Sequence, residues 1–272
     1  MPISRAKLSA AKREASKLIP FARDLAIDAG KVLKRGFHHR LTIQYKGRID
    51  PVTDIDLKSE RLITGAIARQ FPDHAVLTEE GTNSKGRSGV RWIIDPLDGT
   101  VNFAHGFPIY CVSIGFEIDG QLAGGAVFDP ERDELFWGFL GGGAYLNKAR
   151  IAVSKESRLE RALLATGFAY DIGTARRNNL GLFSRVAKKV QGVRRPGSAA
   201  IDLCWLAAGR LDAFWELKLH PWDTAAAKIV VEEAGGRTSR IDGSTHSIFA
   251  ADLLATNRLL HRKLVTLLSG RR

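Results

Sequence analysis

The stretch RWIIDPLDGTVNF, from Arg91 to Phe103, contains the features on which the interpretation of this sequence depends. Its apolar residues Trp92–Ile94 predict a strand in the core. Two aspartates, Asp95 and Asp98, follow, and between them lies a proline that has no N–H to give to a strand ladder. The next residue is a glycine, which permits a tight turn. The pattern predicts two carboxylates that leave the carboxyl end of a buried strand together, where α/β folds place their ligands.

Other acidic residues follow apolar segments elsewhere in the chain. Glu79 and Glu80 end the segment VLTEEG, Asp223 lies in HPWDTAAAKIVVEEAGG, and the segment DPVTDID at 50–56 contains three aspartates. Taken singly, each acid is more typical of the surface or of a helix cap, and Asp223 suits an N-cap. Taken together they favour a common site, because unpaired acids near a core are costly. Their oxygens suit Mg²⁺, which takes one or two carboxylates plus phosphate oxygens.

The composition is that of an ordinary globular protein of 272 residues, 44% of them apolar. The net charge of +12 favours anionic partners such as phosphorylated metabolites, nucleic acid or an acidic membrane surface, although a solvated surface is the simpler explanation. No run of 18 apolar residues exists and the first residues lack a secretory signal, so we expect no membrane span and no export. Cys111 and Cys204 lack CxxC spacing, which predicts buried free thiols in a cytoplasmic protein.

The chain divides into two halves without a linker between them. In the first half we expect a basic helix over 4–18 that ends at Pro20, a second helix from there, a strand at 41–46 and an amphipathic helix at 53–71. Strands and glycine turns follow up to about residue 150. In the second half we expect strands at 162–166, 192–195, 212–217 and 248–255, and helices at 176–190, 199–208, 223–234 and 258–268. Such alternation is typical of sheets covered by helices.

Three ordered motifs resemble those of the inositol monophosphatase superfamily of Mg²⁺-dependent, lithium-sensitive phosphatases. They are PVTDID at 51–56, Glu79 followed by DPLDGT at 95–100, and PWDTAAAKIVVEEAGG at 221–236. The resemblance covers roughly residues 20–270. It implies a layered α-β-α-β-α sandwich of the inositol monophosphatase and fructose-1,6-bisphosphatase type, and a homodimer. We therefore expect a single catalytic domain at 20–272, in halves of about 20–150 and 151–272, preceded by a basic extension at 1–19.

The resemblance also implies two or three bound Mg²⁺ ions that share their ligands. One ion is expected between Glu79, Asp95 and the backbone carbonyl of Leu97. A second is expected between Asp95, Asp98 and Asp223. Two metals of this kind bracket an in-line displacement on phosphorus. No nucleophilic serine or cysteine is then needed.

Two further residues are implied in catalysis. Asp56, with Glu79 through water, is expected to bind a weaker third ion or to position the attacking water. Thr100 is expected to hydrogen-bond that water and to help activate it. The backbone N–H groups of Gly99 and Thr100 are expected to donate hydrogen bonds to the phosphate. Lys46 resembles a family lysine near the phosphate, although the match requires a one-residue gap.

The residues around the motifs favour myo-inositol 1-phosphate as the substrate. The order T-x-N-F after DPLDG resembles inositol monophosphatases. The resemblance implies that Gly197, Ser198 and Ala199, together with Glu216 and Asp98, contact the hydroxyls of the substrate. Glu216 lies seven residues before Asp223, as it does in inositol phosphatases, although an exposed acid at a strand end is the alternative.

Two alternatives remain open at this stage. Arg194 and Arg195 suit a second phosphate, which favours a broader sugar phosphatase that includes fructose 1,6-bisphosphatase, or else they serve a dimer interface. The charge of +12 is equally compatible with an RNA- or transcription-associated factor. The intact set of acids argues against a factor that has lost catalysis.

Overall fold

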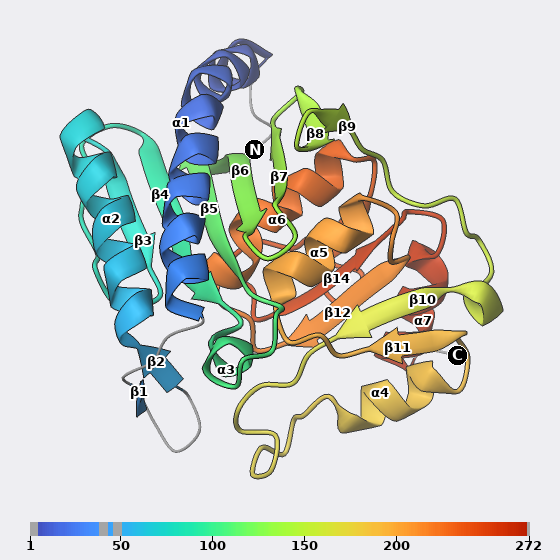
Figure 1. The fold of residues 1–272 in the computed structure, drawn as a ribbon. Coiled ribbons are helices and arrows are strands. Elements are labelled where there is room, and N and C mark those ends of the chain that lie inside the picture. The colour runs from blue at the N-terminus through green and yellow to red at the C-terminus, as the bar shows by residue number, and fades with distance from the viewer. Residues whose placement is uncertain (1–4, 38–42, 46–50, 271–272) are drawn as a thin grey trace.

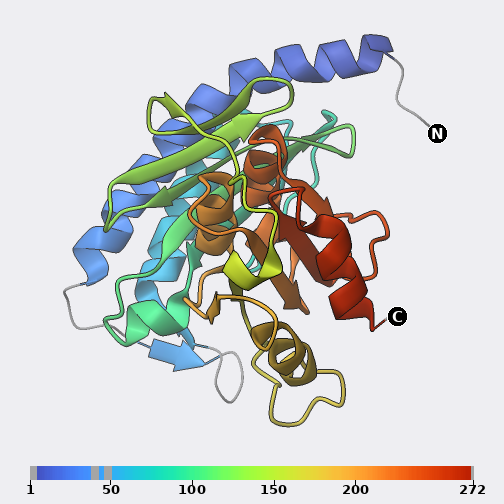
Figure 2. The same cartoon turned by 90° about the vertical axis from the view of Figure 1, so that its right-hand side faces the viewer.

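The computed structural model describes residues 5–37, 43–45 and 51–270, which form two large β-sheets and three helical layers. Helices and sheets alternate in the order helix, sheet, helix, sheet, helix (Figures 1 and 2). This arrangement confirms the predicted α-β-α-β-α sandwich. Within the described ranges, none of the helices combines the length and the apolar character that a bilayer crossing requires.

The first two layers are a pair of helices and a seven-stranded sheet. Helix α1 spans Arg5–Phe37 and α2 spans Asp54–Gln70. The sheet has the order β3-β4-β5-β6-β7-β8-β9 and is antiparallel except for the pair β3 and β4. Its strands are β3 Ala75–Thr78, β4 Val90–Asp98, β5 Cys111–Ile118, β6 Gln121–Asp129, β7 Glu134–Phe139, β8 Gly143–Leu146 and β9 Ala149–Arg150. A short hairpin of β1 Ile43–Tyr45 and β2 Pro51–Thr53 precedes α2.

Helix α1 continues through Pro20, so the predicted break between two helices at this residue is wrong. Proline removes one helical hydrogen bond. The helix persists because its apolar stripe is buried on both sides of this position, at Ala15, Leu18, Ala22 and Leu25. Packing of an amphipathic face contributes most of a helix's stability in a folded protein. The division at residue 19 stays a prediction, as does the role of Lys46, which lies outside the described residues.

The last two layers are a five-stranded sheet and the helices on its outer face. The sheet has the order β11-β10-β12-β14-β13, with β10 parallel to both β11 and β12. Its strands are β10 Leu163–Thr166, β11 Gly192–Arg194, β12 Ala213–Leu217, β13 Arg237–Ser239 and β14 Asp252–Thr256, and the short helix η1 Leu159–Arg161 precedes it. Helices α4 Leu180–Ala187 and α7 His261–Ser269 pack on that face through Leu164, Trp215 and Leu264.

Two elements of this half differ from the prediction. Strand β13 was not expected, and α4 begins at Leu180 rather than near residue 176. Asn179 fixes the start of α4, because its side chain donates to Thr166 Oγ1 and to the Gly167 carbonyl and accepts from Trp215 Nε1. These tertiary hydrogen bonds leave residues 167–178 as a loop above the second sheet.

The middle layer consists of α5 Ala199–Ala207 and α6 Pro221–Glu233, which lie between the two sheets. A row of three glycines crosses the first sheet beneath α6: Gly115, Gly125 and Gly138 are neighbours on β5, β6 and β7. A Cβ atom at Gly125 would lie 2.5 Å from Ala226 Cα, and one at Gly115 would lie 2.8 Å from the Ala226 nitrogen. The row of glycines therefore allows the helix backbone to approach the sheet closely.

Replacing Gly125 by alanine should destabilise the fold. The new methyl group overlaps the backbone of α6, which has to move away from the sheet. Overpacking of this kind costs about 1–3 kcal/mol of the free energy of unfolding. Denaturant unfolding checks this, with Gly173→Ala as the control, because a Cβ atom at Gly173 would meet nothing within 4 Å. Equal midpoints for the two variants would contradict the close approach of α6.

Candidate active site

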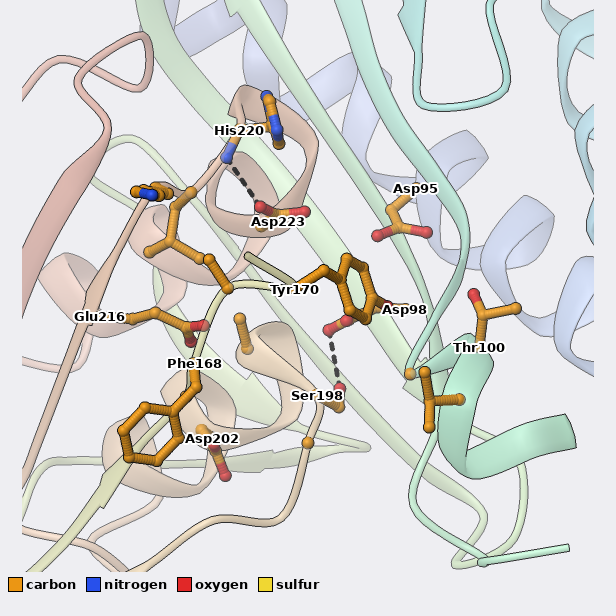
Figure 3. A pocket seen from close by; sticks show the side chains of 18 of the residues that line it. Asp95, Asp98, Thr100, Phe168, Tyr170, Ser198, Asp202, Glu216, His220 and Asp223 are labelled. Atoms are coloured by element: carbon orange, nitrogen blue, oxygen red, sulfur yellow. Dashed lines mark hydrogen bonds between the residues drawn. The ribbon is translucent and has the colours of Figure 1, made fainter. Parts of the chain in front are cut away.

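A pocket of about 500 Å³ opens between the two sheets, where five segments that are distant in sequence meet. Four of them are the end of β4 with the following helix α3 Thr100–Ala104, the loop after β10, the first turn of α5, and the segment that runs from β12 into α6. Glu79, which follows β3, completes one side. Figure 3 shows Asp95, Asp98 and Asp223 around the same space.

The end of β4 presents both aspartates of the DPLDGT motif. The ladder between β4 and β5 is interrupted between Asp95 and Asp98, as the intervening proline predicts, but it resumes when Asp98 pairs with Cys111. The strand is therefore bulged rather than ended at the proline. Asp95 Oδ1 accepts the backbone N–H of Leu97 at 3.0 Å, which fixes one oxygen within the bulge.

Gly99 turns the chain from β4 into α3. It is the N-cap of α3 with φ +94°, a left-handed conformation that favours glycine. A Cβ atom here would lie 2.8 Å from the Ile109 carbonyl oxygen. The glycine of the motif is therefore required by its backbone angle and by the chain that passes beside it.

Asp98 joins the DPLDGT motif to the start of α5. Its Oδ2 accepts a hydrogen bond from Ser198 Oγ at 2.7 Å and another from the Ala200 backbone N–H at 2.8 Å. Ser198 is also the N-cap of α5, and its Oγ accepts the N–H of Ile201 at 3.3 Å. The carboxylate of Asp98 is thus a predicted metal ligand and is also hydrogen-bonded to the segment that is predicted to bind the substrate.

Asp56 reaches the site through Thr100 rather than by lining the pocket. It is the third residue of α2 and forms a capping box with Thr53, the N-cap of that helix. Thr100 Oγ1 lies 3.3 Å from Asp56 Oδ1 and 3.0 Å from the Leu97 carbonyl oxygen, and donates its proton to one of these acceptors. Burial raises the pKa of Asp56 to about 6.

Asp223 occupies the first turn of α6. The helix begins at Pro221 with His220 as its N-cap, so the alternative that Asp223 is itself the N-cap is wrong. Its Oδ2 accepts the backbone N–H of His220 at 2.7 Å, and this bond aims the carboxylate at the pocket (Figure 3).

The acids raise one another's pKa because they share a poorly solvated space. Burial raises the pKa of Asp95 well above its ordinary value, and the charges of Glu79, Asp98 and Asp223 raise it further. Burial likewise raises the pKa of Asp98 and of Asp223, against the hydrogen bonds that they accept. Among the described residues, none of the ion pairs includes Asp95, Asp98 or Asp223. The pocket therefore favours a bound cation.

The donor set fits Mg²⁺ better than a softer metal. Within the described ranges, no three histidine, cysteine or acidic side chains are arranged to hold a metal ion by themselves. Mg²⁺ does not need such a cage, because it takes one or two carboxylates and completes its coordination with waters and phosphate oxygens. The groups that the three motifs contribute to the pocket, Glu79, Asp95, Asp98, Asp223 and the Leu97 carbonyl, all present oxygen.

The opposite wall of the pocket contains Glu216 and the segment that begins α5. Burial and the charge of Asp98 raise the pKa of Glu216 from its ordinary 4.5 to about 8. A Cβ atom at Gly167 would lie 2.2 Å from the Glu216 carboxylate, so a side chain at this position would displace that carboxylate. Gly197, with φ +96°, passes against the amide of Asn102.

The structure brings nearly all of the predicted site residues to one pocket. Glu79, the residues from Asp95 to Thr100 other than the proline, Gly197–Ala199, Glu216 and Asp223 all line it. Asp56 lies behind Thr100. Several lining residues had no assigned role, among them Phe168 and Tyr170 from the loop after β10, and Asp202 from α5. An acid in the first turn of the apolar segment AAIDLCWLA was the only sequence signal for Asp202, and none identified the loop.

Comparison with known proteins agrees with this geometry. The sequence model described as the Inositol monophosphatase family matches residues 14–271. The inositol-1-monophosphatase of a Synechocystis species is 46% identical over 224 residues, which cover 82% of this chain and 78% of that protein. The Nus factor SuhB of Pseudomonas aeruginosa is 38% identical over 248 residues, which cover 89% of this chain and 92% of that protein.

Solved structures show the same similarity in three dimensions. The inositol monophosphatase of Anabaena (Nostoc) superposes with a TM-score of 0.86 at 40% identity, over 94% of this chain and 96% of that one. The structure of inositol monophosphate-bound SaIMPase-II superposes with a TM-score of 0.79 at 29% identity, over 92% of this chain and 93% of that one.

The raised pKa of Glu216 predicts how the stability of the metal-free protein depends on pH. The folded state keeps a proton that the unfolded chain releases above about pH 4.5, so stability falls as pH rises from about 4.5 to about 8. In Glu216→Gln this contribution is absent. In EDTA, the melting temperature of the variant minus that of the wild type should increase as the pH rises from about 5 to about 8. The control is Glu160→Gln at an exposed site, and equal slopes for all three proteins would contradict the assignment.

Proposed function

The chain belongs to the inositol monophosphatase family, and from this premise we propose that its acidic pocket hydrolyses phosphate monoesters, with myo-inositol 1-phosphate as the preferred substrate. The observation that supports this most directly is the convergence of Glu79, Asp95, Asp98 and Asp223 in one pocket without an ion-pair partner for the three aspartates among the described residues. The structure of a relative with inositol monophosphate bound supports the choice of a phosphorylated polyol.

Mg²⁺ is the cofactor that this donor set fits, and two sets of ligands share Asp95. Glu79, Asp95 and the carbonyl of Leu97 would hold one ion, and Asp95, Asp98 and Asp223 would hold a second. When bound, the ions supply Lewis acidity that lowers the pKa of water and offsets the charge of the phosphate. Asp56 is the proposed ligand of a weaker third ion.

Thr100 is the residue that we assign to the attacking water. Its hydroxyl proton is committed to Asp56 or to the Leu97 carbonyl, both of which only accept hydrogen bonds as placed. The oxygen of Thr100 is therefore left to accept a hydrogen bond from the water, which orients a water lone pair toward phosphorus. As the water attacks, its proton passes to Thr100 while the proton of Thr100 passes to the Asp56 carboxylate, which acts as the general base.

The substrate is positioned by the wall that begins α5. Gly99 and Thr100 are assigned to the phosphate through their backbone N–H groups. Gly197, Ser198 and Ala199, with the carboxyl of Glu216, are assigned to hydroxyls, since a polyol presents both donors and acceptors. The hydrogen bonds of Asp98 to Ser198 and Ala200 couple the position of this wall to the metal site.

Replacing Asp95 by asparagine should abolish most of the turnover, because this carboxylate belongs to both ligand sets. The expected loss is two or more orders of magnitude in kcat for inositol 1-phosphate, on the order of what metal activation contributes. Phosphate release in the presence of Mg²⁺ measures it. The melting temperature in EDTA should be equal or higher, because the substitution removes one of several mutually repelling acids.

The matched control is Asp28→Asn on the exposed face of α1, which should keep wild-type turnover. If Asp95→Asn retains near-normal turnover and a wild-type melting curve, the shared metal assignment is wrong.

Other parts of the proposal stay predictions. Fructose 1,6-bisphosphatase activity remains the alternative within the same class of enzyme. A homodimer and a cytoplasmic location belong to these predictions. A role with RNA remains the alternative of another class, supported by the charge of +12 and by similarity to a Nus factor.

Binding to RNA can be separated from phosphatase activity by its dependence on salt. If the basic surface serves RNA, affinity for single-stranded RNA should fall steeply with salt, with a log–log slope that counts the phosphates contacted. Fluorescence anisotropy from about 50 to 200 mM salt measures this slope. We expect no measurable binding for a dedicated metabolite phosphatase, and a steep slope from a measurable affinity would favour the RNA role.

A further inference from the structure

One side of the pocket contains charged side chains that lie apart from the metal-binding motif. Asp202 comes from α5, Glu216 from β12, and Arg195 from the segment between β11 and α5, and all three line the pocket. In Figure 3, Asp202 and Glu216 lie on the other side of the pocket from Asp95 and Thr100. The proposed reaction gives Glu216 a hydroxyl to bind but leaves Asp202 and Arg195 without a role.

Asp202 is a buried carboxyl group whose Oδ1 has no hydrogen-bond partner among the described residues. Only 1% of the residue is exposed. Its own helix offers no free donor, because the backbone N–H groups of Ala200 and Ile201 donate to Asp98 and Ser198. A buried acceptor without a donor is costly. In the wall of a pocket, such an atom is satisfied when a ligand brings the donor.

Arg195 attracts both carboxyl groups without touching either of them. Its charge lowers the pKa of Asp202 and of Glu216, while burial, the larger cause, raises both. Within the described ranges, no ion pair of 4.0 Å or less joins it to either acid. The guanidinium lies instead beside Gly197, where an added Cβ atom would be 2.9 Å from its Nη1. The three charged groups therefore line one pocket and lie close enough for their charges to interact, without an ion pair among them.

A hydroxyl fits this space better than a second phosphate. A hydroxyl donates to a carboxylate and accepts from a guanidinium, so it can satisfy Asp202 and Arg195 together. A phosphate would gain one contact with Arg195 but would be placed beside two carboxyl groups, Asp202 and Glu216. The assignment of the Arg194 and Arg195 pair to a second phosphate is therefore not favoured. Arg194 is exposed, does not line the pocket, and donates to the carbonyl of Val193.

We propose that Asp202 is a specificity-determining residue that accepts a hydrogen bond from a hydroxyl of a polyol monophosphate, and that Arg195 donates to the same hydroxyl or to its neighbour. The proposal rests on the proposed function and narrows it. The substrate class is a monophosphate whose alcohol has several free hydroxyls at the end remote from phosphorus. Bisphosphates and simple alkyl or aryl phosphates do not use this contact.

A structural role for Asp202 makes a different prediction. An acid in the first turn of a helix interacts favourably with the helix dipole, and its loss lowers stability. A purely structural effect, however, would weaken turnover of every substrate alike. The difference between substrates is therefore the informative measurement.

The experiment compares inositol 1-phosphate with p-nitrophenyl phosphate, which has no hydroxyl on its leaving group, in the Mg²⁺-loaded enzyme. Asp202→Ala should raise KM for inositol 1-phosphate about tenfold, the size expected for one charge-assisted hydrogen bond. It should change kcat/KM for p-nitrophenyl phosphate by less than about twofold. Asp202→Asn, which keeps the volume and one acceptor oxygen, should restore part of the loss and serves if the alanine variant does not fold.

The matched control is Asp171→Ala, which removes a half-exposed carboxylate at the rim of the same pocket. It should leave the ratio of the two kcat/KM values unchanged. Equal losses for both substrates in the Asp202 variants, or an unchanged KM for inositol 1-phosphate, would overturn the assignment of Asp202 while leaving the phosphatase intact. A wild-type enzyme that hydrolyses neither substrate would instead overturn the proposed function.

Discussion

The close approach of α6 to the first sheet is the contact on which the site depends. Asp95 and Asp98 belong to that sheet, whereas Asp223 belongs to a helix more than a hundred residues later in the chain. The helix carries Asp223 to the other acids because Gly115, Gly125 and the small residues of α6 let the two backbones come together. The close packing of α6 on the first sheet thus explains the alanines of the WDTAAA segment. The proposed role as a metal ligand explains the aspartate of that segment, Asp223.

The second constraint is the concentration of negative charge in one poorly solvated pocket. The mutual repulsion of Glu79, Asp95, Asp98 and Asp223 is a cost to the folded chain that a cation offsets. Hydrogen bonds donated to the carboxylates offset part of this cost. Examples are the bond from Ser198 to Asp98 and the bond from His220 to Asp223. Strain at a functional site supported by packing elsewhere is the usual arrangement in enzymes.

Much of the fold was predictable because its signals are local. The alternation of helices and strands, the cap at Thr53 and the tight turn at Gly99 each follow from a few neighbouring residues. The failures have a common cause in tertiary contacts. Pro20 does not end α1 because the sheet holds both halves of the helix, and α4 begins late because Asn179 bonds to Thr166 and Trp215.

The sequence by itself determined the family and the layered architecture, and it supplied the carboxylates that we propose as metal ligands, because motif order and hydrophobic period are properties of the chain alone. Only the tertiary structure decided which other groups share the pocket. The sequence pattern predicts only that Asp202 is an ordinary acid in the first turn of a helix. The lack of a hydrogen-bond partner for its Oδ1 among the described residues, and its place in one pocket with Arg195, exist only once α5, β12 and the preceding segment pack together. Burial and unsatisfied polarity are set by contacts between distant residues, which local patterns do not encode.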